Sequence, residues 1–331
     1  MGLRYACKPA NTASHGQATA RWPSSYQHDA ESNEQFVSGI VVMIESQRED
    51  AAFCQSILQK SGSNFALPLR LLSPEKRRGS NALYAFCRLA DDIVDGDAAL
   101  GDKNSSLDEF ERMLRDALNG RMVADPVLRS IARTAGRYSI PHEHLFAIIK
   151  GVRSDLTQSR YETTDSLIEY CRKVASAVGL AAVPIWGLRR GISADEWMPP
   201  ADACGLAFQW TNILRDIVED RERGRVYISE ESFRDAGCDR DDLLAGRIGP
   251  NFNLLASNEI SRAGRWFAEA KHLDEFLSSD GQRVFRAMYG VYRELFRAVE
   301  RAGSAVFTQR VRGSKWRLPM MGVYSVVVGI S

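Results

Sequence analysis

Two segments of the chain end in the same arrangement of acidic residues, and this repeated pattern is the feature that most constrains the fold. Residues 84–95 read YAFCRLADDIVD and residues 208–220 read FQWTNILRDIVED. Each segment is an apolar run that ends in an Arg followed by a D-x-x-x-D cluster. Neither segment contains Gly or Pro, so both are predicted to be helical.

The spacing of the acidic residues gives each predicted helix a carboxylate face. Asp91 and Asp95 share one face of the first helix, and Asp216 and Asp220 share one face of the second. Asn212 lies one turn before Asp216. A carboxylate pair on a helix is most often a solvated surface, but two such pairs set in apolar sequence favour two walls that face inward.

The carboxylate faces also predict a ligand. Like charges four residues apart repel each other unless a cation lies between them. Facing carboxylates with few soft ligands nearby suit a hard dication, Mg²⁺ in the first place and Mn²⁺ as an alternative. Mg²⁺ in proteins usually binds through one or two carboxylates together with substrate phosphate. The pattern therefore predicts a helical cavity that holds a diphosphate through bridging metal ions.

The rest of the chain is predicted to be helical as well. From Glu45 onward apolar residues recur at helical spacing, with loops marked by Gly and Pro and no convincing set of strands, which indicates an all-α fold. Residues 96–106 are predicted to be a loop, with the next helix capped at Ser106. The second acidic helix is expected to follow Pro199 and Pro200.

The ends of the chain differ in composition from this helical region. Residues 1–42 are rich in Ser, Ala, Gln and Asn and lack periodicity, so we expect a disordered N-terminal extension. Its first 28 residues contain basic residues and no acid, a weak similarity to a transit peptide. We therefore predict one helical domain over residues 43–318 and a C-terminal tail over residues 319–331.

Composition argues against several other classes of protein. The 43 basic and 42 acidic residues give a formal net charge of +1, which provides no overall field to attract nucleic acid. The six cysteines are scattered without a C-x-x-C pair, which favours free thiols in a reducing compartment such as the cytoplasm. No apolar run approaches the roughly 20 residues of a spanning helix, so we expect a soluble protein with at most peripheral membrane contact.

Several longer motifs resemble the squalene/phytoene synthase family of head-to-head prenyl synthases. In family order the chain contains S-G-S followed by Phe65, R-L-L-S-P-E-K-R-R, A-L-Y-A-F-C-R-x-x-D-D-I-V-D, Y-C-x-x-V-A-x-x-V-G and F-Q-x-T-N-I-L-R-D-I-V-E-D-x-x-x-G-R-V-Y-I. The resemblance runs from residue 50 or so to residue 318. It implies the isoprenoid-synthase fold, a single bundle of helices around a deep central cavity.

The resemblance implies roles for those residues that match family motifs. It implies metal binding by the two aspartate-rich motifs, through Asp91, Asp92, Asp95, Asn212, Asp216 and Asp220. It implies catalytic positions around the diphosphate region and upper cavity at Tyr84, Arg88, Tyr170, Arg215 and Tyr292. It implies substrate contacts from Asn64, Phe65, Val174, Val178, Gln209, Arg310 and Lys315.

Three further positions differ in how well they match the family pattern. Asn64 stands where the family commonly has Ser, and its amide can still donate a hydrogen bond to a phosphate oxygen. Tyr292 fits the C-terminal tyrosine of the family better than the nearby Tyr289 does. Asp155, in the segment G-V-R-S-D-L, also matches a family pattern.

The resemblance implies the condensation of two farnesyl diphosphates, which are the expected partners, to presqualene diphosphate. Closing the cyclopropane ring loses a proton, either to the released diphosphate or to a tyrosine such as Tyr170. Onward conversion to squalene would require NADPH. The opening S-G-S-N-F and the tail V-F-x-x-R-V-R favour this bacterial hopanoid-type reaction over a phytoene synthase acting on geranylgeranyl diphosphate. A non-catalytic assembly factor of the same fold is a further alternative, which the two complete acidic motifs disfavour.

Overall fold

The computed structural model describes residues 45–311 apart from residues 64, 97 and 159. Contacts within the chain separate Met1–Ser46 from a second unit that begins at Gln47. All elements described below belong to the second unit. The predicted extension over residues 1–42 and the predicted tail over residues 319–331 lie outside the described residues.

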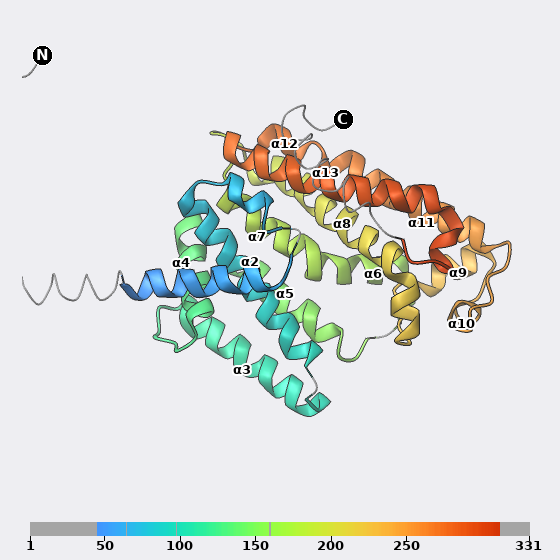
Figure 1. The fold of residues 1–331 in the computed structure, drawn as a ribbon, viewed down its shortest axis with the longest axis horizontal. Coiled ribbons are helices and arrows are strands. Elements are labelled where there is room, and N and C mark those ends of the chain that lie inside the picture. The colour runs from blue at the N-terminus through green and yellow to red at the C-terminus, as the bar shows by residue number, and fades with distance from the viewer. Residues whose placement is uncertain (1–44, 64, 97, 159, 312–331) are drawn as a thin grey trace, which may run out of the picture. The chain divides into compact units, whose positions relative to one another are not determined.

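The described part of the chain is helical, which confirms the predicted all-α class (Figure 1). Residues 47–60 form a helix, and the described residues contain no strand beyond an isolated bridge between Leu188 and Leu277. None of the described helices combines the length and the apolar character that crossing a membrane requires. The other elements are the α-helices α2 (Pro74–Asp95), α3 (Leu100–Leu118), α4 (Pro126–Tyr138), α5 (His142–Ser154), α6 (Thr164–Cys171), α7 (Ala177–Trp186), α8 (Ala194–Glu222), α9 (Glu230–Ala236), α10 (Arg240–Leu244), α11 (Phe252–Ala270), α12 (Leu273–Phe276) and α13 (Ser279–Ala302), the 3-10 helices η1 (Pro68–Leu71) and η3 (Gly303–Phe307), and the π-helical segment η2 (Arg172–Ser176).

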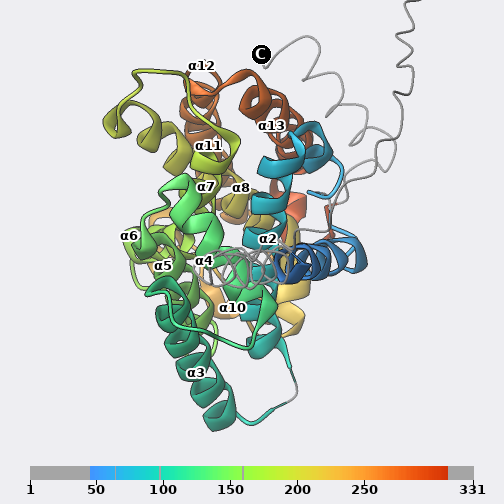
Figure 2. The same ribbon diagram turned by 90° about the vertical axis from the view of Figure 1, so that its left-hand side faces the viewer.

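Two long helices carry the acidic motifs, and each packs against several others (Figure 2). Helix α2 lies against α4 and α7 and bears the first motif at its C-terminal end. Helix α8 lies against α11, α7 and η2 and bears the second motif near its C-terminal end. Helix α7 touches both α2 and α8, so it joins the two motif-bearing helices through one apolar core.

The loop predicted over residues 96–106 is shorter than expected, because α3 begins at Leu100. Polar side chains in this stretch do not cap a later helix start. Asn104 donates to the Leu100 carbonyl and Ser105 donates to the Gly101 carbonyl, each one turn back along the helix. Asn and Ser side chains can either cap a helix start or donate to the preceding turn inside a helix. Residue type alone does not show which of the two occurs here.

The second acidic helix also begins earlier than predicted, at Ala194, and runs through Pro199 and Pro200. A capping box explains the early start. The Glu196 carboxylate accepts hydrogen bonds from both the backbone N–H and the hydroxyl of Ser193, each at 2.8 Å. This cap stabilises the first turn ahead of the two prolines, so they lie inside the helix instead of marking its beginning.

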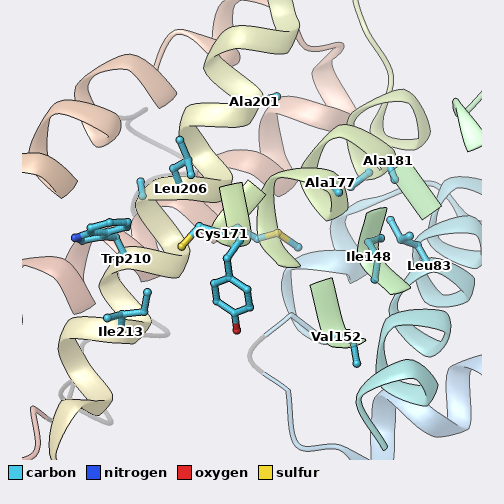
Figure 3. Packing of buried hydrophobic residues seen from close by; sticks show 14 of the residues in the cluster. Leu83, Ile148, Val152, Cys171, Ala177, Ala181, Ala201, Leu206, Trp210 and Ile213 are labelled. Atoms are coloured by element: carbon cyan, nitrogen blue, oxygen red, sulfur yellow. The ribbon is translucent and has the colours of Figure 1, made fainter. Parts of the chain in front are cut away.

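The π-helical segment η2 lies between α5 and α8, and a glycine on each of them allows the close approach. A Cβ atom added to Gly151 would lie 2.7 Å from Val174, and one added to Gly205 would lie 2.4 Å from the backbone of Ser176. Figure 3 shows buried side chains of this region, among them Cys171, which precedes η2, and Leu206 of α8. Both glycines are therefore required by packing, and π-helical turns are frequent at functional sites.

A buried carboxylate pins the helix over residues 47–60 to α4. Asp50 is 1% exposed and accepts hydrogen bonds from Arg129 at 2.5 and 3.1 Å and from Arg133 at 2.6 Å. Burial alone would raise the pKa of Asp50, but the hydrogen bonds and charges of the two guanidinium groups outweigh it and lower the pKa below its ordinary value. The charged form of Asp50 therefore stabilises the fold.

Replacing Asp50 with Asn is expected to lower the free energy of unfolding by about 2 kcal/mol at pH 7. The loss is less than for a fully buried pair because both Arg side chains are partly exposed and Asn keeps one acceptor oxygen. Since the pKa of Asp50 is lowered on folding, its contribution is present above the unfolded value of about 4 and disappears as the pH falls through the folded value. Urea titrations from pH 7 to pH 3 should therefore converge for the two proteins, and a constant difference would contradict the assignment.

Candidate active site

The first acidic motif lies on the last turns of α2. Asp92 forms an ion pair with Arg88, in which the Oδ1 atom of Asp92 lies 2.6 Å from the Nη2 atom of Arg88. The side chain of Asp91 is exposed, yet desolvation by the surrounding protein, together with the charge of Asp95, raises its pKa to about 6.

The second motif lies on α8 and shows the same features. The guanidinium of Arg215 forms two hydrogen bonds with the neighbouring Asp216, one of them from Nε to Oδ1 at 2.8 Å. Burial raises the pKa of Asp220 to about 6, and the charge of Asp216 adds to the rise. The Oδ1 atom of Asn212 is buried and has no hydrogen-bond partner among the described residues.

Asp155, the residue that follows α5, links the two motifs. Its Oδ1 accepts a hydrogen bond from the Tyr170 hydroxyl at 2.8 Å and one from the Tyr227 hydroxyl at 3.4 Å. Burial raises the pKa of Asp155, and its charge interacts with Asp95 on the first motif and with Arg225. Arg225 in turn interacts with Asp220. The two motifs and Asp155 therefore form one electrostatic cluster.

A cluster of three tyrosine rings lies beside Asp155. Tyr170 and Tyr227 stack at a centroid distance of 5.7 Å, and Tyr161 packs against both rings. Burial strongly raises the pKa of Tyr170, and the charge of Asp155 raises it further. In this arrangement the Tyr170 hydroxyl is a hydrogen-bond donor that holds Asp155, and it is a poor proton acceptor.

A second aromatic stack lies beside Asn212. Tyr292 of α13 stacks on Phe208 of α8 with centroids 3.9 Å apart, and on Phe65 at 6.2 Å. Burial raises the pKa of Tyr292, while a hydrogen bond from Asn212 and the charge of Arg215 offset part of the rise. Tyr289 points elsewhere, because its hydroxyl donates to the backbone carbonyl of Phe267 at 2.9 Å. The structure thus places Tyr292, and not Tyr289, beside the second motif.

Several apolar residues on α2, η2, α7 and α8 are packed against the core but keep accessible surface. Cys87 lies one turn before Asp91 on α2, and Cys204 lies one turn before Phe208 on α8. Burial strongly raises the pKa of both thiols, although both residues keep some accessible surface. Val174 and Val178 are also partly accessible. These four positions thus combine apolar character with partial accessibility, and two of them lie on the helices that carry the acidic motifs.

Comparison with known proteins identifies the family. The sequence model described as "Squalene/phytoene synthase" matches residues 58–317. The chain belongs to the squalene/phytoene synthase family. Phytoene synthase 1 of the tomato Solanum lycopersicum is 34% identical over 264 residues, which are 79% of this chain and 64% of the tomato protein. The 15-cis-phytoene synthase of Synechococcus elongatus is 32% identical over 272 residues, covering 80% of this chain and 88% of the cyanobacterial protein.

Solved structures of the squalene/phytoene synthase family share the fold. A dehydrosqualene synthase superposes with a TM-score of 0.75 at 27% identity, covering 86% of this chain and 99% of that protein. The squalene synthase HpnC of Alicyclobacillus acidocaldarius gives a TM-score of 0.72 at 27% identity, covering 78% of this chain and 95% of that protein. The isoprenoid-synthase bundle predicted from the sequence is therefore confirmed, and enzymes of this family are prenyltransferases that join prenyl diphosphates head to head.

Most of the predicted site residues of this family member lie near one another along α2 and α8. Tyr84 lies one turn before Arg88, and Gln209 lies next to Phe208; both are half-buried. Val174 belongs to η2 and Val178 to the start of α7. The predicted substrate residues Asn64 and Lys315 lie outside the described residues.

Arg310 lies at the end of the described chain, close to the second motif. Its exposed guanidinium pairs with the Glu219 carboxylate at 2.5 Å. The backbone carbonyl of Phe307 accepts a further hydrogen bond from Arg221 at 3.2 Å. The C-terminal segment is thus attached to α8 beside Asp220, which is consistent with the predicted contact between Arg310 and a diphosphate.

Three residues of the cluster were not assigned to the site from the sequence: Asp155, Tyr227 and Arg225. Each stands in a segment that matches the family, G-V-R-S-D-L for Asp155 and G-R-V-Y-I for the other two. The family motifs were thus the signal that could have found them. Residue type and spacing gave none, because the three residues meet only in the folded chain.

The residues present fit a magnesium site. Among the described residues no group of three His, Cys, Asp or Glu side chains is arranged as a ready-made metal site. Mg²⁺ commonly needs only one or two carboxylates together with substrate phosphate, so such a group is not required. Burial first, and a neighbouring carboxylate second, raise the pKa of Asp91 and of Asp220, and the Oδ1 atom of Asn212 has no partner among the described residues. A bound dication would stabilise the charged carboxylates and could take the Asn212 oxygen as a ligand.

Proposed function

We propose that this protein condenses two prenyl diphosphates head to head to give a cyclopropylcarbinyl diphosphate. The observation that carries the proposal is the single electrostatic cluster in which Asp155 connects the acidic ends of α2 and α8. We further propose that the partly accessible apolar residues Cys87, Val174, Val178 and Cys204 form an apolar wall that holds the prenyl chains. The family assignment and the synthases among its relatives support the same reaction.

In the proposed reaction the protein first helps diphosphate to leave one substrate. Bound Mg²⁺ would neutralise the leaving diphosphate as a Lewis acid, held by Asp91 and Asp95 on α2 and by Asn212, Asp216 and Asp220 on α8. Arg88 and Arg215 add charge-assisted hydrogen bonds. Both guanidinium groups are close enough to the motifs to do so, since each pairs with an Asp of its own motif.

The allyl cation formed in this way must be kept from water. The rings of Phe65, Phe208 and Tyr292 form a stack beside the second motif, and we propose that this stack stabilises the cation, as aromatic rings can. Carbon 1 of the cation then bonds to the double bond of the second substrate, and loss of a proton closes the three-membered ring. Because the Tyr170 hydroxyl donates to Asp155, we assign the proton to the released diphosphate.

We propose farnesyl diphosphate as the substrate and presqualene diphosphate as the product, from the segments S-G-S-N-F and V-F-x-x-R-V-R. Squalene would follow only with NADPH as reductant. The alternative is geranylgeranyl diphosphate and a phytoene product, which the names of the curated relatives favour. Chain length depends on the depth of the hollow, and therefore on packing beyond the acidic cluster.

One assay tests these proposals together. The purified full chain is incubated with Mg²⁺ and either farnesyl or geranylgeranyl diphosphate, with and without NADPH, and the products are identified by mass. We expect a C30 diphosphate from farnesyl diphosphate without NADPH. A C40 product from geranylgeranyl diphosphate alone would establish the alternative substrate. No turnover of either compound would overturn the enzymatic proposal and favour the non-catalytic factor.

A further inference from the structure

A carboxylate is buried in the contact between α8 and α11, away from the acidic cluster. Glu259 of α11 is 1% exposed. Its Oε2 atom accepts a hydrogen bond from the indole Nε1 of Trp210 at 3.0 Å, and its Oε1 atom has no partner among the described residues. Arg262 supplies the nearest cation, 3.5 Å from Oε2, and its guanidinium lies 5.8 Å from the Trp210 ring centroid.

This arrangement is a poor way to stabilise a fold. Removing a carboxylate from water is costly, and here the compensation is one neutral indole donor and one cation that remains partly exposed. Replacing such a buried charge with an apolar side chain of similar volume is often neutral or stabilising. Both helices also bury apolar residues, among them Leu206 and Ile213 on α8 and Ala256 and Ala263 on α11.

The bond between Trp210 and Glu259 is directional, and apolar contacts are not. Helices α8 and α11 form the most extensive contact between described elements. At about 100° per residue, Trp210 lies about 160° around α8 from Asn212 and about 120° from Asp216, so it faces away from both. A hydrogen bond on the far side of the helix therefore fixes the rotation of α8 about its own axis, which sets where the second motif points.

The required precision makes this rotation matter. Turning a helix by 10° moves a side-chain atom that is 5 Å from its axis by about 1 Å. Catalytic groups need to be held within about 0.5 Å of the productive geometry, and a displacement of about 1 Å can cost about 10²-fold in rate. A small rotation of α8 would thus displace both Asn212 and Asp216 without unfolding the protein.

We propose that Glu259 is a positioning residue that acts through Trp210 to orient the second acidic motif. This inference rests on the proposed function, since it assigns to Glu259 the placement of groups that hold the diphosphate and its metal ions. The proposed role depends on one hydrogen bond between two side chains. Its effect on activity can therefore be separated from the contribution of the whole α8–α11 contact to stability.

The test compares Glu259→Leu with Glu259→Gln, which keeps an acceptor oxygen for the Trp210 indole. For Glu259→Leu we expect an unchanged or higher Tm, a kcat lowered about 10- to 100-fold, and a weaker Mg²⁺-dependent affinity for farnesyl thiodiphosphate, a substrate analogue that does not ionise readily, measured by calorimetry. For Glu259→Gln we expect kcat and affinity close to those of the unmodified protein.

Trp210→Phe provides an independent test because it removes the donor and leaves the carboxylate buried. It should lower Tm and reproduce the loss of kcat, and the double variant with Glu259→Leu should show no further loss of kcat. Wild-type kcat and analogue affinity in Glu259→Leu would overturn the inference, as would a loss of activity that only follows a fall in Tm. An equal loss in Glu259→Gln would overturn it as well. Inactivity of the unmodified protein would instead contradict the proposed function.

Discussion

Replacing Asp91 with Asn should reduce kcat about 10³-fold while leaving the Tm unchanged or slightly raised. The size of the loss is that expected when a main source of electrostatic stabilisation is removed from a transition state. The effect on stability follows from the position of Asp91, which desolvation and the charge of Asp95 make unfavourable to ionise. A neutral amide removes that repulsion, so the carboxylate is retained at a cost in stability, as is common at functional sites.

The measurement is steady-state turnover of the prenyl diphosphate that the wild-type protein accepts, over a range of Mg²⁺ concentrations, together with thermal unfolding followed by circular dichroism. Asp102→Asn is the matched control, because it makes the same chemical change at an exposed residue of α3. The control should retain wild-type kcat and nearly the same Tm. An Asp91→Asn protein with wild-type kcat would remove the proposed metal role of the first motif.

The acidic faces could be predicted because they depend on sequence close in the chain. An i,i+4 pair in a segment without Gly or Pro has only one plausible local structure, and α2 and α8 carry Asp91, Asp95, Asp216 and Asp220 as expected. The bundle itself followed from helical periodicity and from family motifs. Local patterns fixed the type of the elements better than their ends, as the early start of α3 at Leu100 shows.

The connection between the two motifs could not be predicted from residue types and spacing. Asp155 follows the last residue of α5, Tyr170 lies in the last turn of α6, and Tyr227 lies in a segment without regular structure 72 residues from Asp155. Nothing local indicates that their side chains converge. In the same way Glu259 reads as one more surface acid of α11, and only Trp210, 49 residues away, makes it a buried hydrogen-bonded group.

The π-helical segment η2 is another feature that local sequence does not specify, since the apolar spacing from Thr164 to Ala181 predicts one continuous helix. Its geometry depends on how closely neighbouring helices approach. Gly205 of α8 faces the backbone of Ser176, and the Ser176 hydroxyl donates to the Asp202 carbonyl at 2.9 Å. The segment carries Val174 and precedes Val178, so the same close approach places two residues of the proposed prenyl-binding wall.

Replacing Gly205 with Ala is therefore expected to destabilise the protein by about 3 kcal/mol, the upper end of the usual cost of overpacking. The added methyl group would lie 2.4 and 2.5 Å from the Cα and N atoms of Ser176, and backbone atoms cannot move aside as a side chain can. The helices must separate, which also displaces Val174 and Val178. We expect KM for the prenyl diphosphate to rise in whatever fraction remains folded.

Gly264→Ala on α11 is the control that isolates this clash from the general effect of the substitution. Its added methyl group would lie 3.9 Å from the Phe296 ring, an ordinary contact, and Ala is favoured over Gly inside a helix by about 1 kcal/mol. Denaturant unfolding should therefore show a lower midpoint for Gly205→Ala and an equal or higher midpoint for Gly264→Ala. Equal midpoints for the two variants would show that α8 and η2 are not packed as closely as the structure has them, and the placement of the apolar wall would have to be revised.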